Sequence, residues 1–378
     1  MTGSAALAVI GAGASGMAAA IAAARTAPGG GQRILLLERL PRAGKKLLAT
    51  GNGRCNLSNR SAPAHPYHNR AFALPALRAF EAERFFRSLG LLLAEDGEGR
   101  LYPRSNTAAS VLDALRLGVA RHSVELCCDQ PVATVQRRGS GFLINGALQA
   151  ARVILATGGC AAPAQGSDGS GFALLEALGH RIFPPRPALV QLKASAPLLP
   201  PLRGLRVKCA AALEDPQGRA LCRAKGEILF AQDGISGIAA MELSRAARPG
   251  CTLALDLIPE LALPALEHFF IRLCQDCPEL SPAQALAGLL PRRVGEAVLR
   301  QSGIGKAAIA ALSTGEISRL CAAVKRFTFP LDGTRGFAQA QVTAGGAEVS
   351  QFDPRTLESR LAPGLYACGE LLDVDGGC

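Results

Sequence analysis

Tryptophan is absent from this sequence, tyrosine occurs three times, and aromatic residues make up only 4% of the 378 residues. Recognition of single-stranded nucleic acid by base stacking on aromatic side chains therefore has little support. No apolar run reaches the roughly 20 uncharged residues that a membrane-spanning helix needs. Prolines and acidic residues interrupt even the most apolar late stretch, residues 253–273. A signal peptide's charged start is also lacking, so the sequence predicts a cytoplasmic protein without a membrane anchor.

Metal-binding patterns are lacking as well, although the chain has 12 cysteines. Cys274 and Cys277 have the C-x-x-C spacing, but no second pair accompanies them. A structural zinc site needs about four ligands, and the five histidines show no paired spacing. We therefore expect no metal site, and we interpret most of the cysteines as small buried apolar residues.

Lysine is scarce too. Only 7 of the 41 basic residues are lysine, so arginine accounts for most of the formal net charge of +11. The excess has two interpretations: a compositional bias, or a polyanionic partner such as nucleic acid, because arginine clusters favour phosphate. Basic residues gather in the segments 203–208, 292–300 and 325–326. Charge alone leaves both interpretations open.

The first 38 residues, in contrast, carry a clear pattern. Residues 6–10 are a short apolar strand, residues 14–27 are rich in alanine and favour a helix, and residues 33–38 form a second buried strand. Because a helix separates the two strands, they are expected to be parallel. The segment predicts a βαβ unit.

The turn after the first strand has the spacing of a dinucleotide-binding motif. Gly11 permits the tight turn, Gly13 lets the backbone approach a pyrophosphate, and Gly16 permits close packing of helix on strand. The free N–H groups at the start of the helix favour phosphate. Glu38 follows Gly16 by 22 residues, where a carboxylate accepts from ribose hydroxyls. The order of these features predicts dinucleotide binding, and a purely structural glycine turn is the alternative.

The rest of the chain divides into recognisable regions. Helices are expected over residues 71–90 and 107–121, a β-meander over 131–148, and a third buried strand over 151–156. A composition shift at residues 184–187 opens a stretch of short strands with Gly and Pro turns. Residues 261–324 are mostly helical, and residues 366–370 again resemble a strand that ends in a glycine turn. The simplest architecture is a doubly wound α/β domain interrupted by an insertion.

Two features favour FAD over NAD as the dinucleotide. The chain has a single fingerprint, whereas a reductase that holds two dinucleotides usually has two, and the late Gly369-Glu370 follows the meander and the third strand. A second glycine-rich turn, residues 166–171, lacks a preceding strand in the required position. We expect it to lie near the flavin or the substrate as the start of a helix.

Several further motifs resemble the BaiN/RdsA family of FAD-dependent oxidoreductases, also labelled aminoacetone-oxidase-like. The most specific is Gly44-Lys45-Lys46-Leu47 followed by residues 50–59, and the other motifs span residues 102–105, 156–159, 226–237, 341–346 and 369–376. The resemblance covers essentially the whole chain. It implies a Rossmann-like FAD-binding domain of the glutathione-reductase/fumarate-reductase type, interrupted by an inserted β-domain and a small helical subdomain. The boundaries expected are 1–190, 191–258, 259–328 and 329–378, the first and last segments forming the FAD-binding domain.

The resemblance also implies which residues hold FAD. The glycine turn faces the pyrophosphate, Glu38 the adenosine ribose, residues 51–56 the flavin and pyrophosphate, Val132 the adenine through its backbone, and Glu370 the ribityl chain. The full set implied is Gly11, Gly13, Ala14, Ser15, Gly16, Glu38, Arg39, Lys46, Gly51, Asn52, Gly53, Arg54, Cys55, Asn56, Val132, Thr157, Gly158, Gly159, Gly369, Glu370 and Asp375. In the family a further segment and a flavin-facing helix follow, whereas this sequence stops at Cys378, so we expect a truncated sequence that lacks that helix.

Two residues are candidates for catalysis. Cys55 lies in the loop implied to pass along the flavin, where Arg54 would favour its thiolate. A structural or cofactor-contact role is the alternative, because no partner cysteine lies close in sequence. Tyr102 is a candidate proton donor, with aromatic packing as its alternative.

The reaction expected from the family is hydride transfer from flavin to an electron-poor C=C bond, with NAD(P)H as the transient reductant. The family's names point to a uracil base of ribosomal RNA, which would become dihydrouridine, or to an unsaturated 3-oxo steroid. The charge of +11 favours the RNA. An aminoketone oxidase is a further alternative, and a nucleotide-binding remnant without activity is the non-enzyme alternative.

Overall fold

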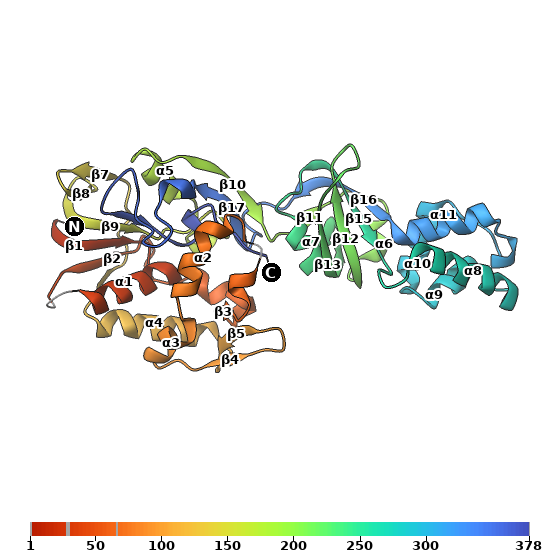
Figure 1. The fold of residues 1–378 in the computed structure, drawn as a ribbon, viewed down its shortest axis with the longest axis horizontal. Coiled ribbons are helices and arrows are strands. Elements are labelled where there is room, and N and C mark those ends of the chain that lie inside the picture. The colour runs from red at the N-terminus through yellow and green to blue at the C-terminus, as the bar shows by residue number, and fades with distance from the viewer. Residues whose placement is uncertain (1, 28–30, 66, 378) are drawn as a thin grey trace. The chain divides into compact units, whose positions relative to one another are not determined.

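The computed structural model describes residues 2–27, 31–65 and 67–377 (Figure 1). They form two compact units, one made of the residues up to 186 together with 341–377, and the other of residues 187–340. The segments 187–190 and 329–340, which we expected in the FAD-binding part, lie in the second unit. The reason is that strand β16 (Phe327–Thr334) pairs there with β15 (Pro249–Asp256) and β11 (Leu192–Lys193).

The first unit is built on a parallel sheet. Its strands β6 (Glu125–Cys127), β2 (Ile34–Leu37), β1 (Gly3–Ile10), β9 (Leu148–Leu155) and β18 (Leu365–Ala367) lie side by side in that order. The antiparallel strands β7 (Val135–Arg138) and β8 (Gly141–Ile144) extend the sheet beside the first half of β9 and form the predicted meander. The βαβ unit, the meander and the third strand are therefore confirmed.

Both faces of this sheet are buried, which explains why its strands are continuously apolar. On one face Val9 and Leu36 pack with Met17 of α1 (Ala14–Thr26) and Leu115 of α4 (Ala108–Arg121). On the other face a second cluster includes Phe142 and Phe352, together with residues of α5 (Ser170–Glu176). The turn between β1 and α1 is thus held between two hydrophobic cores.

The expected helix over residues 71–90 is wrong in one respect, because the structure has two helices. α2 (Arg70–Ala79) and α3 (Ala82–Ser88) are separated by two non-helical residues, Phe80, whose backbone is extended, and Glu81. Phe80 is half-exposed, and its ring packs against that of Phe85 in α3, with ring centroids 5.4 Å apart. Other elements of this unit are η1 (Lys46–Gly53), β3 (Ser58–Asn59), η2 (Ala62–Ala64), β4 (Leu93–Glu95), β5 (Arg100–Pro103), η3 (Pro163–Gln165), β10 (Ile182–Ala188), β17 (Val342–Ala347), η5 (Val349–Gln351) and η6 (Gly369–Leu371).

The second unit combines a closed barrel with helices. The barrel order is β11, β14 (Gly234–Ser236), β13 (Ala220–Ala231), β12 (Arg206–Glu214), β15 and β16. The helical elements of this unit are α6 (Leu199–Leu202), α7 (Ile238–Leu243), α8 (Leu263–Asp276), α9 (Pro282–Ala287), α10 (Arg292–Ser302), η4 (Ile309–Ala311) and α11 (Thr314–Lys325). Capping boxes at Ser281–Gln284 and Ser313–Glu316 start α9 and α11. One hydrophobic core joins Phe230 and Phe329 of the barrel to Phe270 of α8, so barrel and helices are one compact unit.

Candidate functional site

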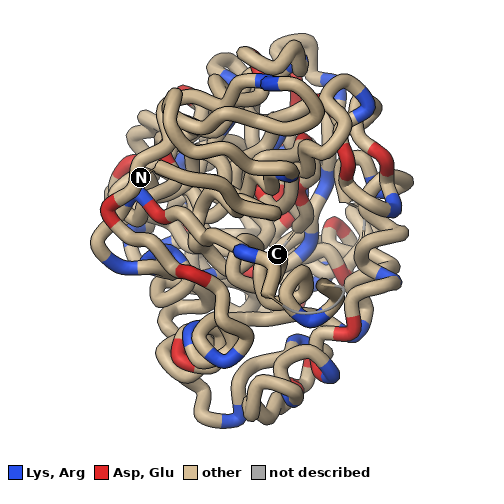
Figure 2. The backbone as a smooth tube through the Cα atoms, turned by 90° about the vertical axis from the view of Figure 1, so that its left-hand side faces the viewer, with Lys and Arg blue, Asp and Glu red and all other residues tan. Residues whose placement is uncertain are grey.

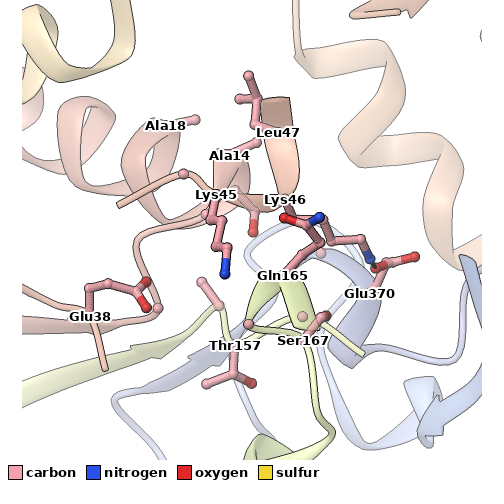
Figure 3. A pocket seen from close by; sticks show the side chains of 18 of the residues that line it. Ala14, Ala18, Glu38, Lys45, Lys46, Leu47, Thr157, Gln165, Ser167 and Glu370 are labelled. Carbon is pink, nitrogen blue, oxygen red and sulfur yellow. Dashed lines mark hydrogen bonds and ion pairs between the residues drawn. The ribbon is translucent and has the colours of Figure 1, made fainter. Parts of the chain in front are cut away.

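A cavity of about 740 Å³ lies in the first unit, where strands β1, β2 and β9 end. Ile10, Leu37 and Ala156, at or just beyond the carboxyl ends of these strands, all contribute to its wall. In doubly wound α/β folds ligands bind at this edge of the sheet. Figure 3 shows side chains from several segments of the chain surrounding this space.

The three glycines of the first turn are required for different reasons. Gly11 has φ +102°, and a Cβ there would lie 2.5 Å from the carbonyl oxygen of Ala156. A Cβ at Gly16 would lie 1.8 Å from the carbonyl oxygen of Gly11, so only glycine allows this approach of helix and turn. A Cβ at Gly13 would meet nothing within 4 Å. Gly13 therefore leaves open space toward the cavity, as a turn that approaches a pyrophosphate requires.

The start of α1 offers hydrogen-bond donors to the same space. Gly13 is the N-cap of this helix and supplies no side-chain cap, and the first turn contains no acidic residue. Ala14 and Ser15 line the cavity. Uncapped N–H groups and the helix dipole make such a terminus favourable for a negative group.

Glu38, which follows β2, is hydrogen-bonded to this turn. Its carboxylate accepts a 2.9 Å hydrogen bond from the backbone amide of Ala12 and a 3.0 Å bond from that of Leu40. The side chain also lines the cavity. The end of β2 is thereby tied to the glycine turn, and Glu38 stays fixed in orientation beside the open space.

Lys46 and Glu370 form an ion pair in the cavity wall, although 324 residues separate them. The second carboxylate oxygen of Glu370 accepts from the backbone amide of Thr343 at 3.4 Å. Both ion-pair partners are less than one-third exposed. η1, β17 and η6 are brought together by these contacts.

A glycine-rich loop, residues 160–169, forms a further part of the wall. Arg39 pairs with Asp168 and donates to the carbonyl oxygen of Gly166 at 3.0 Å, and Lys45 donates to the carbonyl oxygen of Ala164 at 2.9 Å. Partial burial opposes ionisation of Asp168, but hydrogen bonds from Arg39 and Ser170 hold its pKa below the usual value. The turn 166–171, expected near the cofactor, contributes Gly166, Ser167 and Ser170 to the cavity.

The two candidate catalytic residues lie in different surroundings. Cys55 lines the cavity, and burial raises the pKa of its thiol, although a hydrogen bond from Thr50 opposes this shift. That direction is opposite to the expectation that Arg54 favours a thiolate. The Arg54 guanidinium instead lies 4.7 Å from the centre of the Tyr102 ring. Tyr102 is buried in β5 and is not part of the cavity wall, which supports its packing role.

The cavity brings together most of the residues that the sequence implied for the cofactor. Those in its wall are Gly11, Gly13, Ala14, Ser15, Glu38, Arg39, Lys46, Cys55, Asn56, Val132, Thr157, Gly158, Gly369 and Glu370. Those outside it are Gly16, Gly51, Asn52, Gly53, Arg54, Gly159 and Asp375.

The residues outside the wall have other surroundings. A Cβ at Gly159 would lie 2.3 Å from Thr343 Oγ1, so this glycine serves the packing of β17. Asp375 is buried elsewhere, and its carbonyl oxygen accepts from the backbone amide of His68 at 2.9 Å. Gly51 and Asn52 have left-handed backbone conformations that kink the chain within η1.

Several wall residues were not identified from the sequence. They include Lys45, Gln130, Gln165, Gln341, Val342 and Cys368. Lys45 adjoins the identified Lys46, and Gln341 and Val342 open a motif used for the family resemblance, so adjacency was an available signal. Burial raises the pKa of Cys368 to about 11, which makes it a neutral thiol in the wall.

The charges of the wall suit a dinucleotide. Four basic side chains, Arg39, Arg42, Lys45 and Lys46, face two acidic ones, Glu38 and Glu370. The excess of positive charge fits a diphosphate, and the open space at Gly13 fits its close approach. The residues present therefore fit the FAD implied by the sequence.

Among the described residues, no group of three or more His, Cys, Asp or Glu side chains is arranged to hold a metal ion. None of the helices described is both long and apolar enough to cross a membrane.

Comparison with known proteins identifies the family. The family described as HI0933-like protein Rossmann domain matches residues 5–378. The chain belongs to this family. Its predicted resemblance to the BaiN/RdsA flavoproteins and its Rossmann-type FAD-binding α/β fold are thereby confirmed.

Two curated relatives cover nearly the whole chain. The chain is 39% identical to a 3-dehydro-bile acid delta(4,6)-reductase of Clostridium scindens, over 98% of this chain and 93% of the relative. It is 28% identical to the ribosomal RNA dihydrouridine synthase of Escherichia coli, over 97% of this chain and 92% of the relative. The expectation of an FAD-dependent oxidoreductase is supported by the family.

Two solved structures also align with most of the chain. One is a flavocytochrome c3 fumarate reductase, with a TM-score of 0.45 and 15% identity over 99% of this chain and 73% of the other. The second is the 3-ketosteroid delta1-dehydrogenase of Sterolibacterium denitrificans, with a TM-score of 0.48 and 13% identity over 98% and 94%.

Proposed function

We propose that this protein reduces a C=C bond conjugated to a carbonyl group, using FAD and a reduced nicotinamide as the source of electrons. One observation carries the proposal: the wall of the cavity fits FAD, and two relatives that cover nearly the whole chain are named for reductions of this kind. The names of these relatives describe a delta(4,6)-reductase of a steroid and a synthase of dihydrouridine. Dihydrouridine is uridine reduced at the C=C bond next to a carbonyl, so both names describe one class of reaction.

The site residues have distinct roles in this proposal. The glycine turn and the start of α1 bind the diphosphate, Glu38 accepts from the adenosine ribose, and Glu370 accepts from the ribityl chain. Lys46 orients Glu370 through their ion pair. Bound FAD supplies the hydride chemistry, and these residues supply its binding and orientation.

Cys55 has a limited role in the proposal. Because burial raises the pKa of its thiol, Cys55 keeps a proton on Sγ at neutral pH. A neutral thiol in the wall contacts the cofactor without acting as a redox thiolate. Tyr102, buried outside the wall, supports the loop that carries Arg54.

Uracil in ribosomal RNA is the substrate that we favour. One outward face of the barrel supports it, because adjacent strands β12 and β13 place four basic residues there: Arg206, Lys208, Arg223 and Lys225. Two acidic residues share this face, Glu227, which pairs with Arg206, and Glu214, which pairs with Arg326. Figure 2 shows basic and acidic positions interspersed along the backbone. A local excess of Arg and Lys suits a phosphate backbone.

An unsaturated steroid is the second candidate. It is favoured by the higher identity of the bile-acid reductase, 39% against 28% for the dihydrouridine synthase. A small enone does not need a basic face on the barrel, whereas RNA does. The two candidates therefore differ in whether that face matters for activity.

Three assays test the proposal, the third being peroxide formation with an aminoketone. The first measures dihydrouridine in ribosomal RNA after deletion of the gene, and the second measures NADH or NADPH consumption by the FAD-loaded protein with an unsaturated 3-oxo bile acid. Loss of dihydrouridine supports the RNA substrate, while unchanged RNA together with enone-dependent oxidation of NAD(P)H supports the steroid. Rapid peroxide formation with an aminoketone, with neither of these results, would contradict the proposed reduction and support an oxidase. A protein that is inactive in all three assays would point to a nucleotide-binding protein.

A further inference from the structure

Lys45 is a wall residue whose charge is not balanced. Its ammonium donates one hydrogen bond, 2.9 Å long, to the carbonyl oxygen of Ala164. That acceptor is neutral, and within the described residues no carboxylate forms an ion pair with Lys45. Figure 3 shows the side chain extending into the space that the wall encloses, on the same side as Glu38.

The acidic groups nearby already have partners. Glu38 accepts the backbone amides of Ala12 and Leu40, and Glu370 accepts Lys46 and the amide of Thr343. Asp168 is paired with Arg39. Lys45 is thus an exposed cation in the cavity wall that pairs with no carboxylate of the wall, and a charge-assisted hydrogen bond to an anionic ligand is stronger than one to a neutral carbonyl.

The same cavity contains the open space at Gly13 and the uncapped start of α1. The start of the helix contributes a partial positive charge, and the Lys45 ammonium contributes a full one. Arg39 and Lys46, which resemble it in type, are each held by a carboxylate. Lys45 is therefore better placed than either to gain an anionic partner when a ligand enters.

We infer that Lys45 binds the diphosphate of the dinucleotide, exchanging the Ala164 carbonyl for a phosphate oxygen. The inference rests on the FAD binding of the proposed function. It adds Lys45 as the residue that recognises the diphosphate of FAD. The exchange also releases Ala164, so occupation of the cavity changes how the loop 160–169 is anchored. A purely structural Lys45 would hold this loop in both states.

FAD titrations of the cofactor-free protein test the inference, with thermal melting as a check of folding. The variants are Lys45→Met, Lys45→Arg and a matched control, Lys306→Met, which removes one exposed positive charge in the second unit. We expect Lys45→Met to weaken FAD binding about 10- to 100-fold, the range for loss of a charge-assisted hydrogen bond. Its Kd should also rise less steeply with salt concentration, because one screened attraction is missing.

The other variants separate charge from structure. Lys45→Arg should retain most of the affinity and the salt dependence, and Lys306→Met should match the wild type. Competition by ADP against FAD should weaken in Lys45→Met as FAD binding does. A Lys45→Met protein with wild-type Kd, or with weaker binding and an unchanged salt dependence, would overturn the inference while leaving FAD binding intact. A wild-type protein that binds neither FAD nor ADP would overturn the inference and the proposed function together.

Discussion

The backbone amide of Ala12 donates a 2.9 Å hydrogen bond to the Glu38 carboxylate. This bond joins the glycine turn after β1 to the end of β2, and it places the carboxylate beside the space at Gly13. The glycine turn and Glu38, which lie 26 residues apart in the sequence, are thus held together in the structure. Glu38 has a second acceptor contact with Leu40, so its orientation is fixed before any ligand binds.

Substitution of Glu38 tests this element. Glu38→Ala removes the acceptor of two backbone amides and should lower the free energy of unfolding by about 1–3 kcal/mol. It should also weaken FAD binding, because the ribose loses its acceptor. Glu38→Gln keeps one oxygen acceptor and should lose less stability. Urea unfolding and FAD titration measure both effects, and equal stability of Glu38→Ala and the wild type would contradict the assigned contacts.

Gly13 and Gly16 should respond differently to alanine. A Cβ at Gly13 enters open space and its φ of −76° suits alanine, so Gly13→Ala should fold with an unchanged melting temperature. The new methyl group occupies the place of the diphosphate, and FAD affinity should fall at least about tenfold.

Gly16→Ala is the matched comparison. Its Cβ would lie 1.8 Å from the carbonyl oxygen of Gly11, so the turn must shift and the protein should be clearly destabilised. Melting curves and FAD titration of both variants are compared under the same conditions. If Gly13→Ala binds FAD like the wild type, the diphosphate does not approach this turn.

Cys55 should react slowly with alkylating reagents in the folded protein. Burial raises the pKa of its thiol, so the thiolate is a small fraction near pH 8. Mass spectrometry of Cys55 after iodoacetamide treatment, in native and urea-unfolded protein, measures this protection. Cys55→Ser should keep FAD affinity and activity within about threefold of the wild type. Fast alkylation at neutral pH, with loss of activity in Cys55→Ser, would restore the thiolate hypothesis.

His180 should make the protein less stable in acid. Ser359 Oγ accepts from the backbone amides of Leu361 and Ala362, so its hydroxyl donates to His180 Nε2 at 2.8 Å. Nδ1–H is then the donor to the carbonyl oxygen of Leu175 at 3.2 Å, and the imidazole is neutral.

The sign of the pH dependence follows from this contact. Burial lowers the pKa of His180 below its usual 6.5, so at lower pH the unfolded chain binds a proton that the folded one does not. The free energy of unfolding should therefore fall as pH decreases below about 6.5. His180→Gln should be less stable than the wild type at pH 7, and the difference should shrink toward pH 5. A difference that grows in acid would show that the folded protein binds the proton.

Local patterns predicted the βαβ unit well because its causes are local. Gly11, Gly13 and Gly16 act within one turn, and the apolar run 34–37 needs only burial on both faces of the sheet. The break between α2 and α3 was missed because residues 79–82 contain neither Gly nor Pro to indicate it. The extent of the second unit was missed for a similar reason. Leu192 pairs with Thr334, which lies 142 residues later, and no local sequence pattern predicts a strand pair this far apart.

In the wall of the cavity, too, residues in local motifs were predicted and residues placed by contacts between distant segments were not. Residues in motifs, such as Glu38 and Thr157, were identified from the sequence. Gln165 and Gln130 were not, because their positions depend on how their loops fold against the residues that follow β2. Gly159 and Asp375 are in motifs but outside the wall. Motif membership alone therefore does not tell a ligand contact from a packing contact.

FAD binding by the purified protein tests the account most directly. The protein is stripped of bound cofactor, titrated with FAD and followed by the change in flavin fluorescence, with Gly13→Ala as the negative control. The account predicts saturable binding of one FAD per chain, weakened at least about tenfold in the variant. A preparation that stays colourless and shows no saturable binding at any FAD concentration tested would contradict it.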